Sequence, residues 1–278
     1  MFNKIDKPLI MGILNITPDS FSDGGLFTEV ESAVKHAKKM MAAGVDIIDI
    51  GGESTRPGSD SVAEAQQIVR VVPIIKAIRK QLSDTVLISI DTTISGVANA
   101  ALKAGANIVN DISAGQSDAA MFKLVSKREV PIILMHKKGT PKTMQENPSY
   151  EEVVSEVVES LMTSVEEALE AGIKKHNIAI DPGIGFGKRR EDNINLLAHL
   201  EDIVKMGYPV LLGTSRKRFM GSLCSVSSPK SLGTATAVTT ALGIMAGVKI
   251  FRVHDVEENR QAADVAWAIK QAKEHSAF

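Results

Sequence analysis

Short apolar runs alternate with longer amphipathic segments along the whole chain. Four of the runs follow an Ala-Gly pair and end in a polar or acidic residue, at residues 43–50, 104–111, 171–181 and 246–255. A glycine in this place is typical of a helix end, where a left-handed conformation lets the chain turn back into a parallel strand. We therefore expect a strand in each of these four ranges.

Four further runs are nearly continuous in Ile, Leu and Val, at residues 8–15, 86–91, 130–136 and 208–215. Continuous runs of this length are typical of parallel strands that are buried on both faces. The segments between the strands carry helical periodicity. In one of them, Ser149 and Glu152 have the spacing of a capping box, which predicts that the long helix ending near residue 171 begins near residue 150.

Eight strands in strict alternation with eight helices are the signature of a (β/α)₈ barrel, the TIM barrel. The alternative fold is a doubly wound open sheet, which normally carries a glycine-rich dinucleotide turn after its first strand. Residues 12–21 (GILNITPDSF) do not form such a turn. A barrel of this kind typically has about 250 residues, and no linker divides this chain, so we predict a single domain over residues 1–278.

The composition mainly excludes other classes of protein and leaves the predicted barrel unchanged. The formal net charge of −1 offers no general attraction to nucleic acid or to an anionic membrane. No run approaches the roughly 18 apolar residues of a membrane span, and the N-terminus lacks the pattern of a signal peptide. The single cysteine, Cys224, allows no intramolecular disulfide. We expect a soluble, cytoplasmic protein.

Polar side chains follow every predicted strand. In a barrel the carboxyl ends of the strands meet on one face, where the loops build the active site. Burying each polar group without a partner would cost about 1–3 kcal/mol, so a ligand-binding mouth is the economical explanation. In strand order, the ends carry Asn15, residues 51–59 (GGESTRPGS), Asp91, Asn110, His136, Asp181, residues 213–217 (GTSRK) and residues 252–255 (RVHD).

Four of these side chains suit a flat heterocycle. Asp91 and Asp181 are bidentate acceptors. Asn110 both donates and accepts, and Lys217 adds a cationic donor. Together they fit an amino-pyrimidinone edge, whose ring N–H and exocyclic NH₂ would face a carboxylate.

Other strand-end residues suit an anion and a metal ion. Arg56, Arg252 and His254 can form charge-assisted hydrogen bonds with a group such as phosphate. Asn15 offers a neutral oxygen to a Mg²⁺ ion that keeps most of its waters. His136 has no partner motif, and we interpret it as a loop or core histidine whose hydrogen bonds are satisfied.

The glycine-rich segment at residues 183–188 (GIGFGK) lacks the spacing of a phosphate-binding P-loop. We interpret its glycines as letting the backbone approach a ring closely.

Eight segments, in order, resemble the signature segments of the dihydropteroate synthase family. They run from about residue 9 to residue 256: GILNITPDSFSDGG, DIGGESTRPG, SIDT, NDISAG, LMHKKGTP, DPGIGFGK, GTSRKRF and RVHDV. The resemblance implies a transferase of folate biosynthesis. Its substrates would be 6-hydroxymethyl-7,8-dihydropterin pyrophosphate and p-aminobenzoate, and its products 7,8-dihydropteroate and pyrophosphate.

The resemblance also implies roles for single residues. The pterin would be held by Asp91, Asn110, Asp181 and Lys217. The pyrophosphate would be bound by Asn15, Arg252 and His254, with Mg²⁺ beside Asn15. The catalytic group would consist of Asp91, Lys217, Arg252 and His254.

Around p-aminobenzoate, the resemblance implies a closing loop that carries Thr55, Arg56 and Pro57, with residues 19–25 as its partner. Phe186 would wall the aromatic ring. Many relatives have Ser directly after the Lys of the SRK segment, where this chain has Arg218. The p-aminobenzoate carboxylate could therefore meet backbone N–H groups at the next helix start, the side chains of Ser215 or Arg216, or Arg218 itself.

Members of this family are usually homodimers through their last helices, and sulfonamides mimic p-aminobenzoate, so we expect a homodimer and sulfonamide inhibition. Lys137 and Lys138 make one segment more basic than the usual pattern, with no assigned role.

Two other functions stay open. A pterin-binding methyltransferase that uses methyltetrahydrofolate would share the Asp-Asn-Asp set but would not need the STRPG, SRK and RVH segments. A pterin-binding scaffold without catalysis would not need the pyrophosphate set of Asn15, Arg252 and His254.

Overall fold

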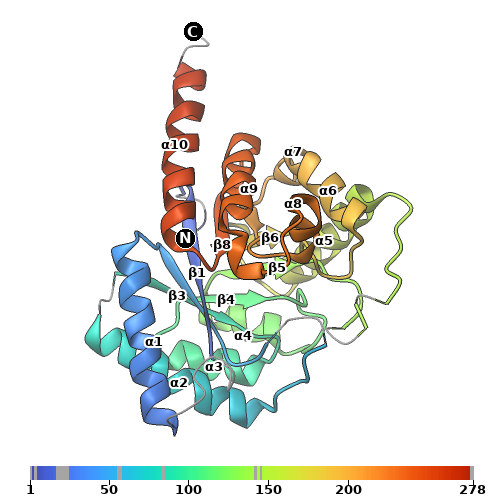
Figure 1. The fold of residues 1–278 in the computed structure, drawn as a ribbon. Helices are drawn as coiled ribbons and strands as arrows, with labels where there is room; N and C mark the ends of the chain where they lie inside the picture. Colours follow the sequence, from blue (N-terminus) through green and yellow to red (C-terminus); the bar gives the residue numbers. More distant parts are fainter. Residues whose placement is uncertain are drawn as a thin grey trace.

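The computed structural model describes residues 2, 5–16, 25–54, 58–82, 85–140, 143–144 and 146–275. Within these ranges, eight strands form one parallel sheet (Figure 1). They are β1 (Leu9–Asn15), β2 (Ile47–Gly51), β3 (Leu87–Asp91), β4 (Ile108–Asp111), β5 (Ile132–Met135), β6 (Ile178–Asp181), β7 (Leu211–Leu212) and β8 (Ile250–Val253). Each strand lies within its predicted range, or within one residue of it.

The strands follow one another around a nearly closed barrel. Hydrogen-bonded neighbours run in the order β6-β5-β4-β3-β2-β1-β8-β7. The remaining join, between β6 and β7, is a bridge of Ile180 with Val210, where Ile180 N donates to Pro209 O (3.0 Å). A doubly wound sheet would reverse its strand order, so that alternative is wrong and the predicted (β/α)₈ barrel is confirmed.

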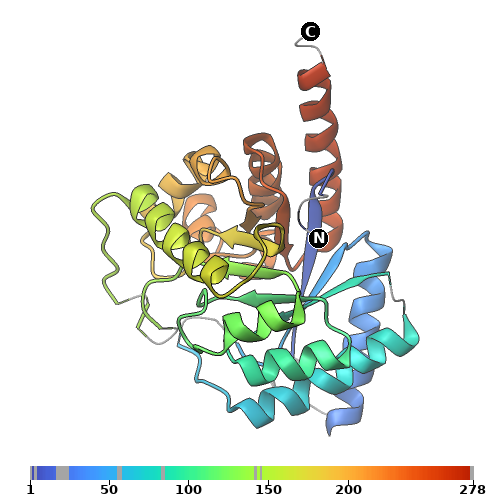
Figure 2. The same ribbon diagram turned by 180° about the vertical axis from the view of Figure 1, so that it is seen from behind.

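Helices cover the outside of the barrel (Figure 2). The described helices are α1 (Gly25–Ala42), α2 (Glu64–Gln81), α3 (Ser95–Ala104), α4 (Met121–Arg128), α5 (Val153–Glu170), α6 (Arg190–Ala198), α7 (Leu200–Val204), α8 (Arg218–Cys224), α9 (Gly233–Ala246) and α10 (Val256–His275). The prediction of one helix per connection is wrong at two places, because both α6 and α7 follow β6, and both α8 and α9 follow β7. No helix in the described ranges is long and apolar enough to cross a membrane.

The Ala-Gly pairs turn the chain as predicted. Their glycines, Gly44, Gly105, Gly172 and Gly247, all have positive φ, at 83°, 118°, 89° and 103°. At Gly105 the left-handed residue ends α3, and its N–H bonds back to Ala101 O and Leu102 O. A side chain would strain this conformation, which explains why glycine stands where each helix gives way to a strand.

The start of α5 differs from the prediction. The helix begins at Val153, and no side chain at its N-cap makes a capping hydrogen bond. Instead Glu156, one turn into the helix, reaches back, so that its Oε1 accepts from the backbone N–H groups of Glu151 (2.8 Å) and Glu152 (3.3 Å). The predicted Ser149–Glu152 box is wrong, because these amides find an acceptor inside the helix.

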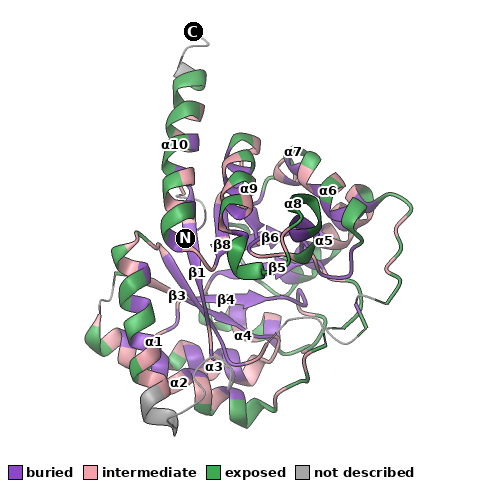
Figure 3. Ribbon diagram, viewed as in Figure 1, coloured by how far each residue is buried: buried purple, intermediate pink, exposed green. Residues whose placement is uncertain are grey.

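The barrel interior changes from apolar to polar toward the carboxyl ends of the strands. An apolar cluster, which we call the lower layer, lies further from the carboxyl ends of the strands. It consists of Phe2, Met11, Ile47, Ile108, Ile133, Ala179, Leu211 and Ile250. Side chains alternate between the two faces of a strand, so the residue two positions further points inward again. On β2, β4, β6 and β8 these next positions carry Asp49, Asn110, Asp181 and Arg252. Figure 3 shows the strands as buried, so this polar layer lies inside the protein.

Candidate active site

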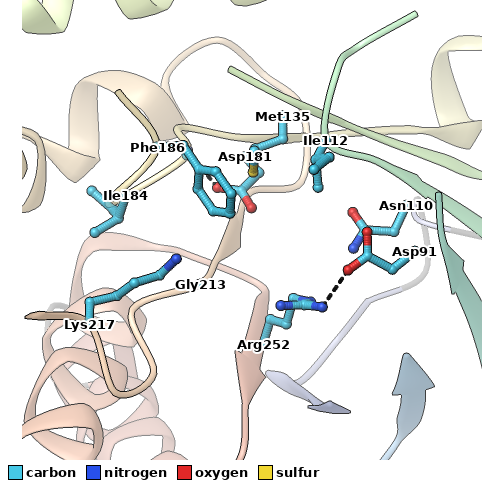
Figure 4. A pocket seen from close by; sticks show the side chains of 11 residues that line it. Asp91, Asn110, Ile112, Met135, Asp181, Ile184, Phe186, Gly213, Lys217 and Arg252 are labelled. Atoms are coloured by element: carbon cyan, nitrogen blue, oxygen red, sulfur yellow. Dashed lines mark hydrogen bonds and ion pairs between the residues drawn. The ribbon is translucent and has the colours of Figure 1, made fainter. Parts of the chain in front are cut away.

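A pocket lies at the carboxyl ends of the strands (Figure 4). Its lining consists of Asp91, Asn110, Ile112, Met135, Asp181, Gly183, Ile184, Phe186, Gly213, Lys217 and Arg252. The predicted heterocycle set of two aspartates, an asparagine and a lysine is thus brought together in one place, with Phe186 and Arg252 beside it. Three of its four members end β3, β4 and β6, and the fourth comes from the loop after β7.

Arg252 is held by two carboxylates. Its Nε donates to Asp49 Oδ2 (2.7 Å), and its Nη2 donates to Asp91 Oδ2 (2.6 Å). Both aspartates are buried. The sequence analysis assigned Arg252 to an anion alone and missed Asp49, whose signal was an acidic residue inside the otherwise apolar run at 47–50.

Burial raises the pKa of both carboxyl groups that line the pocket. The pKa of Asp91 rises to about 7, because the loss of water around the carboxylate outweighs the attraction of Arg252, and the negative Asp49 raises it further. The pKa of Asp181 rises to about 6, also through burial, against the opposing effect of the Gly183 N–H that its Oδ1 accepts at 2.7 Å. Asp91 Oδ1 is buried without a hydrogen-bond partner in the described structure, so an acceptor is ready for a ligand donor.

Lys217 packs its ammonium on an aromatic face. Its Nζ lies 4.1 Å from the centroid of the Phe186 ring, a cation–π contact. Burial lowers the pKa of Lys217 to about 8, and the neighbouring Arg252 lowers it as well, while Asp181 opposes the shift. Lys217 and Phe186 therefore form one wall of the pocket that is both aromatic and cationic at neutral pH.

The glycines of the segment 183–188 bring its backbone against other backbone segments. A Cβ at Gly183 would lie 1.8 Å from His136 O, and one at Gly187 would lie 2.1 Å from Lys138 O. Neither distance is possible for a real side chain. We predicted that these glycines let the backbone approach a ring closely. In the structure, Gly183 and Gly187 instead let this turn pack closely on the segment after β5.

Lys188 and His136 form a buried pair beneath this turn. Lys188 Nζ lies 2.8 Å from His136 Nδ1 and donates to Gly183 O (2.9 Å) and Phe186 O (3.2 Å). The three contacts match the three N–H bonds of an ammonium group. They fix the turn that carries Phe186. The interpretation of His136 as a satisfied histidine is confirmed, whereas Lys188 was missed because its contact with His136 joins the ends of two different strands.

His254 ends the last barrel strand and is held by Ser215. Ser215 Oγ accepts the backbone N–H of His254 (3.1 Å) and lies 2.9 Å from its Nδ1. With one lone pair used in this way, the hydroxyl can donate to Nδ1, which leaves the proton of the neutral ring on Nε2. His254 does not line the pocket of Figure 4, although it follows Arg252 by two residues.

The described contacts narrow the possible partners of the p-aminobenzoate carboxylate. Ser215 is engaged with His254, and Arg216 Nε donates to Asp255 Oδ2 (3.0 Å). Arg218 begins α8 directly after Lys217 of the first pocket, and it also lines a second pocket with Ser222 and Leu232. Arg218 itself and the backbone N–H groups at the start of α8 stay open as partners of the carboxylate.

Asn15 stands where a metal ion would find oxygen ligands. It ends β1 opposite Gly51, and a Cβ at Gly51 would lie 3.5 Å from Asn15 Oδ1 and 3.7 Å from Asp91 Oδ2. The missing side chain leaves a space bordered by an amide and a carboxylate oxygen, the ligand types that Mg²⁺ prefers. Asp91 Oδ2 is already paired with Arg252 Nη2 (2.6 Å), so the Mg²⁺ site beside Asn15 stays a prediction. In the described ranges, no group of three His, Cys, Asp or Glu side chains could hold a metal.

Thr55, Arg56 and Pro57 lie outside the described residues, as do residues 17–24, so the closing loop stays a prediction. Gly52 and Glu53, just before residues 55–57, are anchored by hydrogen bonds from α2. Gln67 Nε2 donates to Glu53 Oε2 (2.7 Å), and Arg70 Nη1 donates to Gly52 O (2.8 Å). The first part of the loop is thereby tied to α2.

A (β/α)₈ barrel with two buried aspartates, an asparagine and a lysine at its strand ends has the fold and site of a pterin-binding enzyme. Residues 11–254 match the sequence model of the family described as pterin binding enzyme, and the chain belongs to this family.

Within the family, its relatives are dihydropteroate synthases, transferases of folate biosynthesis. The enzyme of Clostridium beijerinckii is 46% identical over 263 residues, which cover 94% of each chain. The crystal structure of the Clostridium difficile enzyme in the presence of pteroic acid has a TM-score of 0.90 and 43% identity, covering 97% of this chain and 99% of that one. The Yersinia pestis enzyme in complex with a sulfonamide drug has a TM-score of 0.90 and 38% identity, covering 96% of both. The predicted family is confirmed.

Proposed function

We propose that the chain condenses 6-hydroxymethyl-7,8-dihydropterin pyrophosphate with p-aminobenzoate to give 7,8-dihydropteroate and pyrophosphate. The observation that carries this proposal is the convergence of Asp91, Asn110, Asp181 and Lys217 on one pocket. Two carboxylates, an amide and a cation can satisfy every polar atom on the edge of a pterin. The Clostridium difficile relative, whose structure was determined with pteroic acid, supports the same ligand class.

The charges of the site favour loss of pyrophosphate before attack by the amine. The C–O bond breaks with both electrons going to the leaving oxygen, and a cation delocalised over the pterin forms. The carboxylates of Asp91 and Asp181 line the pocket, and in their ionised form they would stabilise a cation bound between them. Charges that are already in place stabilise a cation without reorganisation.

The second half of the reaction needs positioning more than chemistry. The lone pair of the arylamine forms the new C–N bond, and the nitrogen then loses one proton to solvent or to the released pyrophosphate. The Phe186 ring, held by the contacts of Lys188, would support the ring of p-aminobenzoate. A well-oriented bound amine reacts far faster than a free one.

The leaving group would be met by Arg252 and His254, with Mg²⁺ held beside Asn15. The ion would supply positive charge to the pyrophosphate oxygens. If Ser215 Oγ donates to its Nδ1, His254 carries its proton on Nε2 and can donate a hydrogen bond to the same group. Thr55, Arg56 and Pro57 would close over the site and exclude water, which would otherwise trap the cation.

We also propose a homodimer built on α9 and α10, which pack against each other. Exposed apolar side chains lie along both helices: Val238, Leu242, Met245, Val265 and Ile269. The C-terminal half of α10 extends beyond the body of the molecule (Figure 1). A partner subunit would cover this apolar surface. A cytoplasmic location, expected from the sequence, stays a prediction.

A turnover assay tests the reaction. Purified protein is incubated with Mg²⁺, dihydropterin pyrophosphate and p-aminobenzoate, and both products are followed. We expect dihydropteroate and pyrophosphate in equal amounts, and a loss of at least about 100-fold in kcat/KM for Asp181→Asn, which removes a charged acceptor of the pterin. Pterin binding without formation of either product would contradict the proposal.

A further inference from the structure

Asp49 lies beneath the pocket and contacts two of its residues at once. Its side chain is fully buried on β2. The same oxygen, Oδ2, accepts from Arg252 Nε (2.7 Å) and from Asn110 Nδ2 (3.2 Å). Asp49 itself does not line the pocket, so it acts on a ligand only through these two neighbours.

The contact with Asn110 decides which way its amide points. A carboxylate that is paired with an arginine can only accept hydrogen bonds, so it holds the NH₂ end of the amide. The reverse orientation would place two oxygens against each other in a buried site. The carbonyl end, Oδ1, is thereby left for the pocket that Asn110 lines (Figure 4).

We propose that Asp49 is a positioning residue that fixes Asn110 as a hydrogen-bond acceptor, so that this wall selects a heterocycle carrying an N–H or NH₂ group there. A ring nitrogen with a lone pair at the same place would meet the Asn110 oxygen and be repelled. This selection adds a determinant of specificity to the proposed function. It rests on the proposed function only for the identity of the heterocycle.

A double-mutant cycle between positions 49 and 110 tests this role. The probe is 6-hydroxymethylpterin without pyrophosphate, which leaves the anion contacts of Arg252 out of the measurement, and its Kd is measured by calorimetry. In Asp49→Asn a neutral amide oxygen replaces the charged acceptor that Arg252 and Asn110 share, so the orientation of Asn110 is held less firmly. We expect a Kd about 10- to 100-fold higher than in the wild type.

The exchange variant D49N/N110D supplies the rescue. The carboxylate introduced at position 110 presents an oxygen to the pocket in either orientation. The amide introduced at position 49 can donate to that carboxylate with its nitrogen in the place of Asp49 Oδ2, while Arg252 keeps its contact with Asp91. We expect the Kd to return to within about fivefold of the wild type. The KM for p-aminobenzoate should stay unchanged in all variants that turn over.

Ser89→Ala is the matched control, because Ser89 is buried on β3 in register with Asp49 but does not line the pocket. Its Kd should equal that of the wild type, and thermal melting of each variant shows whether it folds. A wild-type Kd in Asp49→Asn, or a double variant no better than Asp49→Asn, overturns the positioning role. If the coupling is found but the wild type makes no product, the proposed reaction fails and the positioning role stands. A wild type that does not bind the probe overturns both.

Discussion

At the scale of single residues, removal from water dominates the behaviour of the two carboxyl groups in the pocket. The pKa of Asp91 is raised to about 7 and that of Asp181 to about 6. Near neutral pH each therefore exists partly as a neutral acid, which is a weaker acceptor for ligand N–H groups. Binding of a donor-rich heterocycle competes with this protonation.

We expect the affinity for 6-hydroxymethylpterin to fall as the pH is lowered through 7 and 6, where the carboxyls take up protons, and to fall again above about pH 8, where Lys217 loses its proton. Once both carboxyls are protonated, each further unit should weaken binding by up to about tenfold per carboxyl. Calorimetric titrations between about pH 5 and 8.5 would measure the dependence. In Asp91→Asn the step near pH 7 should be absent, and a profile identical to that of the wild type would contradict the assignment.

Stability has the opposite sign of pH dependence, which separates it from binding. In the unfolded chain both carboxyls have an ordinary pKa near 3.8. Between that value and about 7 the folded state binds more protons than the unfolded state, so ionisation costs stability as the pH rises through this window. A loss of affinity at low pH therefore cannot be attributed to these groups unfolding the protein.

That Asp91, Asn110 and Asp181 lie together could be predicted from the sequence, because each stands at or next to the end of an apolar strand and topology alone brings such residues together. Their role in binding a heterocycle stays a prediction. Sequence reasoning failed for Asp49 and Lys188, whose roles depend on which distant atoms lie within hydrogen-bond reach. Spacing along the chain carries no such information.

At the scale of elements, the segment between β5 and α5 is held by a basic residue without an assigned role in the sequence analysis. Lys138 Nζ lies 4.3 Å from the centroid of the Tyr150 ring and 3.5 Å from Glu156 Oε2. Tyr150 OH in turn donates to Gly187 O (2.7 Å). Lys138 thus serves to dock this connection onto the turn that carries Phe186.

Glu156→Ala should destabilise the protein by about 1 kcal/mol, the usual loss for a capping interaction. The substitution removes the acceptor of two backbone N–H groups before α5 and a partner of Lys138. Denaturant unfolding would measure the change in the free energy of unfolding. Glu166→Ala, an exposed site on the same helix, is the control and should change it by less than about 0.5 kcal/mol. Equal effects at the two sites would contradict the capping role.

Element boundaries were harder to predict than element types. The apolar runs marked all eight strands, because burial on both faces leaves little freedom in composition. The start of α5, predicted near residue 150, lies at Val153, since a glutamate one turn into the helix competes with a serine before it for the same amides. The doubled helices after β6 and β7 gave no periodic signal, because α7 has 5 residues and α8 has 7.

At the scale of the whole molecule, the barrel with its alternating strands and helices could be predicted from the sequence. Assembly into an oligomer could not, because the sequence does not show which surface residues lie side by side. The exposed residues recur at helical spacing along α9 and along α10, and the structure adds that these two helices pack against each other. Leu242 is 62% exposed and Val265 is 62% exposed, unusual values for large aliphatic side chains in the described structure.

If the proposed homodimer forms, Leu242→Asp should convert it to a monomer, because a charged side chain would be buried in the interface without a partner. Light scattering coupled to size-exclusion chromatography would measure the mass, and circular dichroism would confirm the fold. Val69→Asp places the same charge on an exposed aliphatic site of α2, far from α9 in sequence, and should leave the mass unchanged. A wild-type protein that is monomeric at high concentration would contradict the proposed dimer.

The apolar lower layer and the polar upper layer inside the barrel can change separately in evolution. Ile47, Ile133 and Ile250 carry packing, while Asp49, Met135 and Arg252, two residues further along the same strands, carry or border the chemistry. A lineage could therefore replace the upper layer, one strand end at a time, and acquire a new ligand while the lower layer keeps the chain folded.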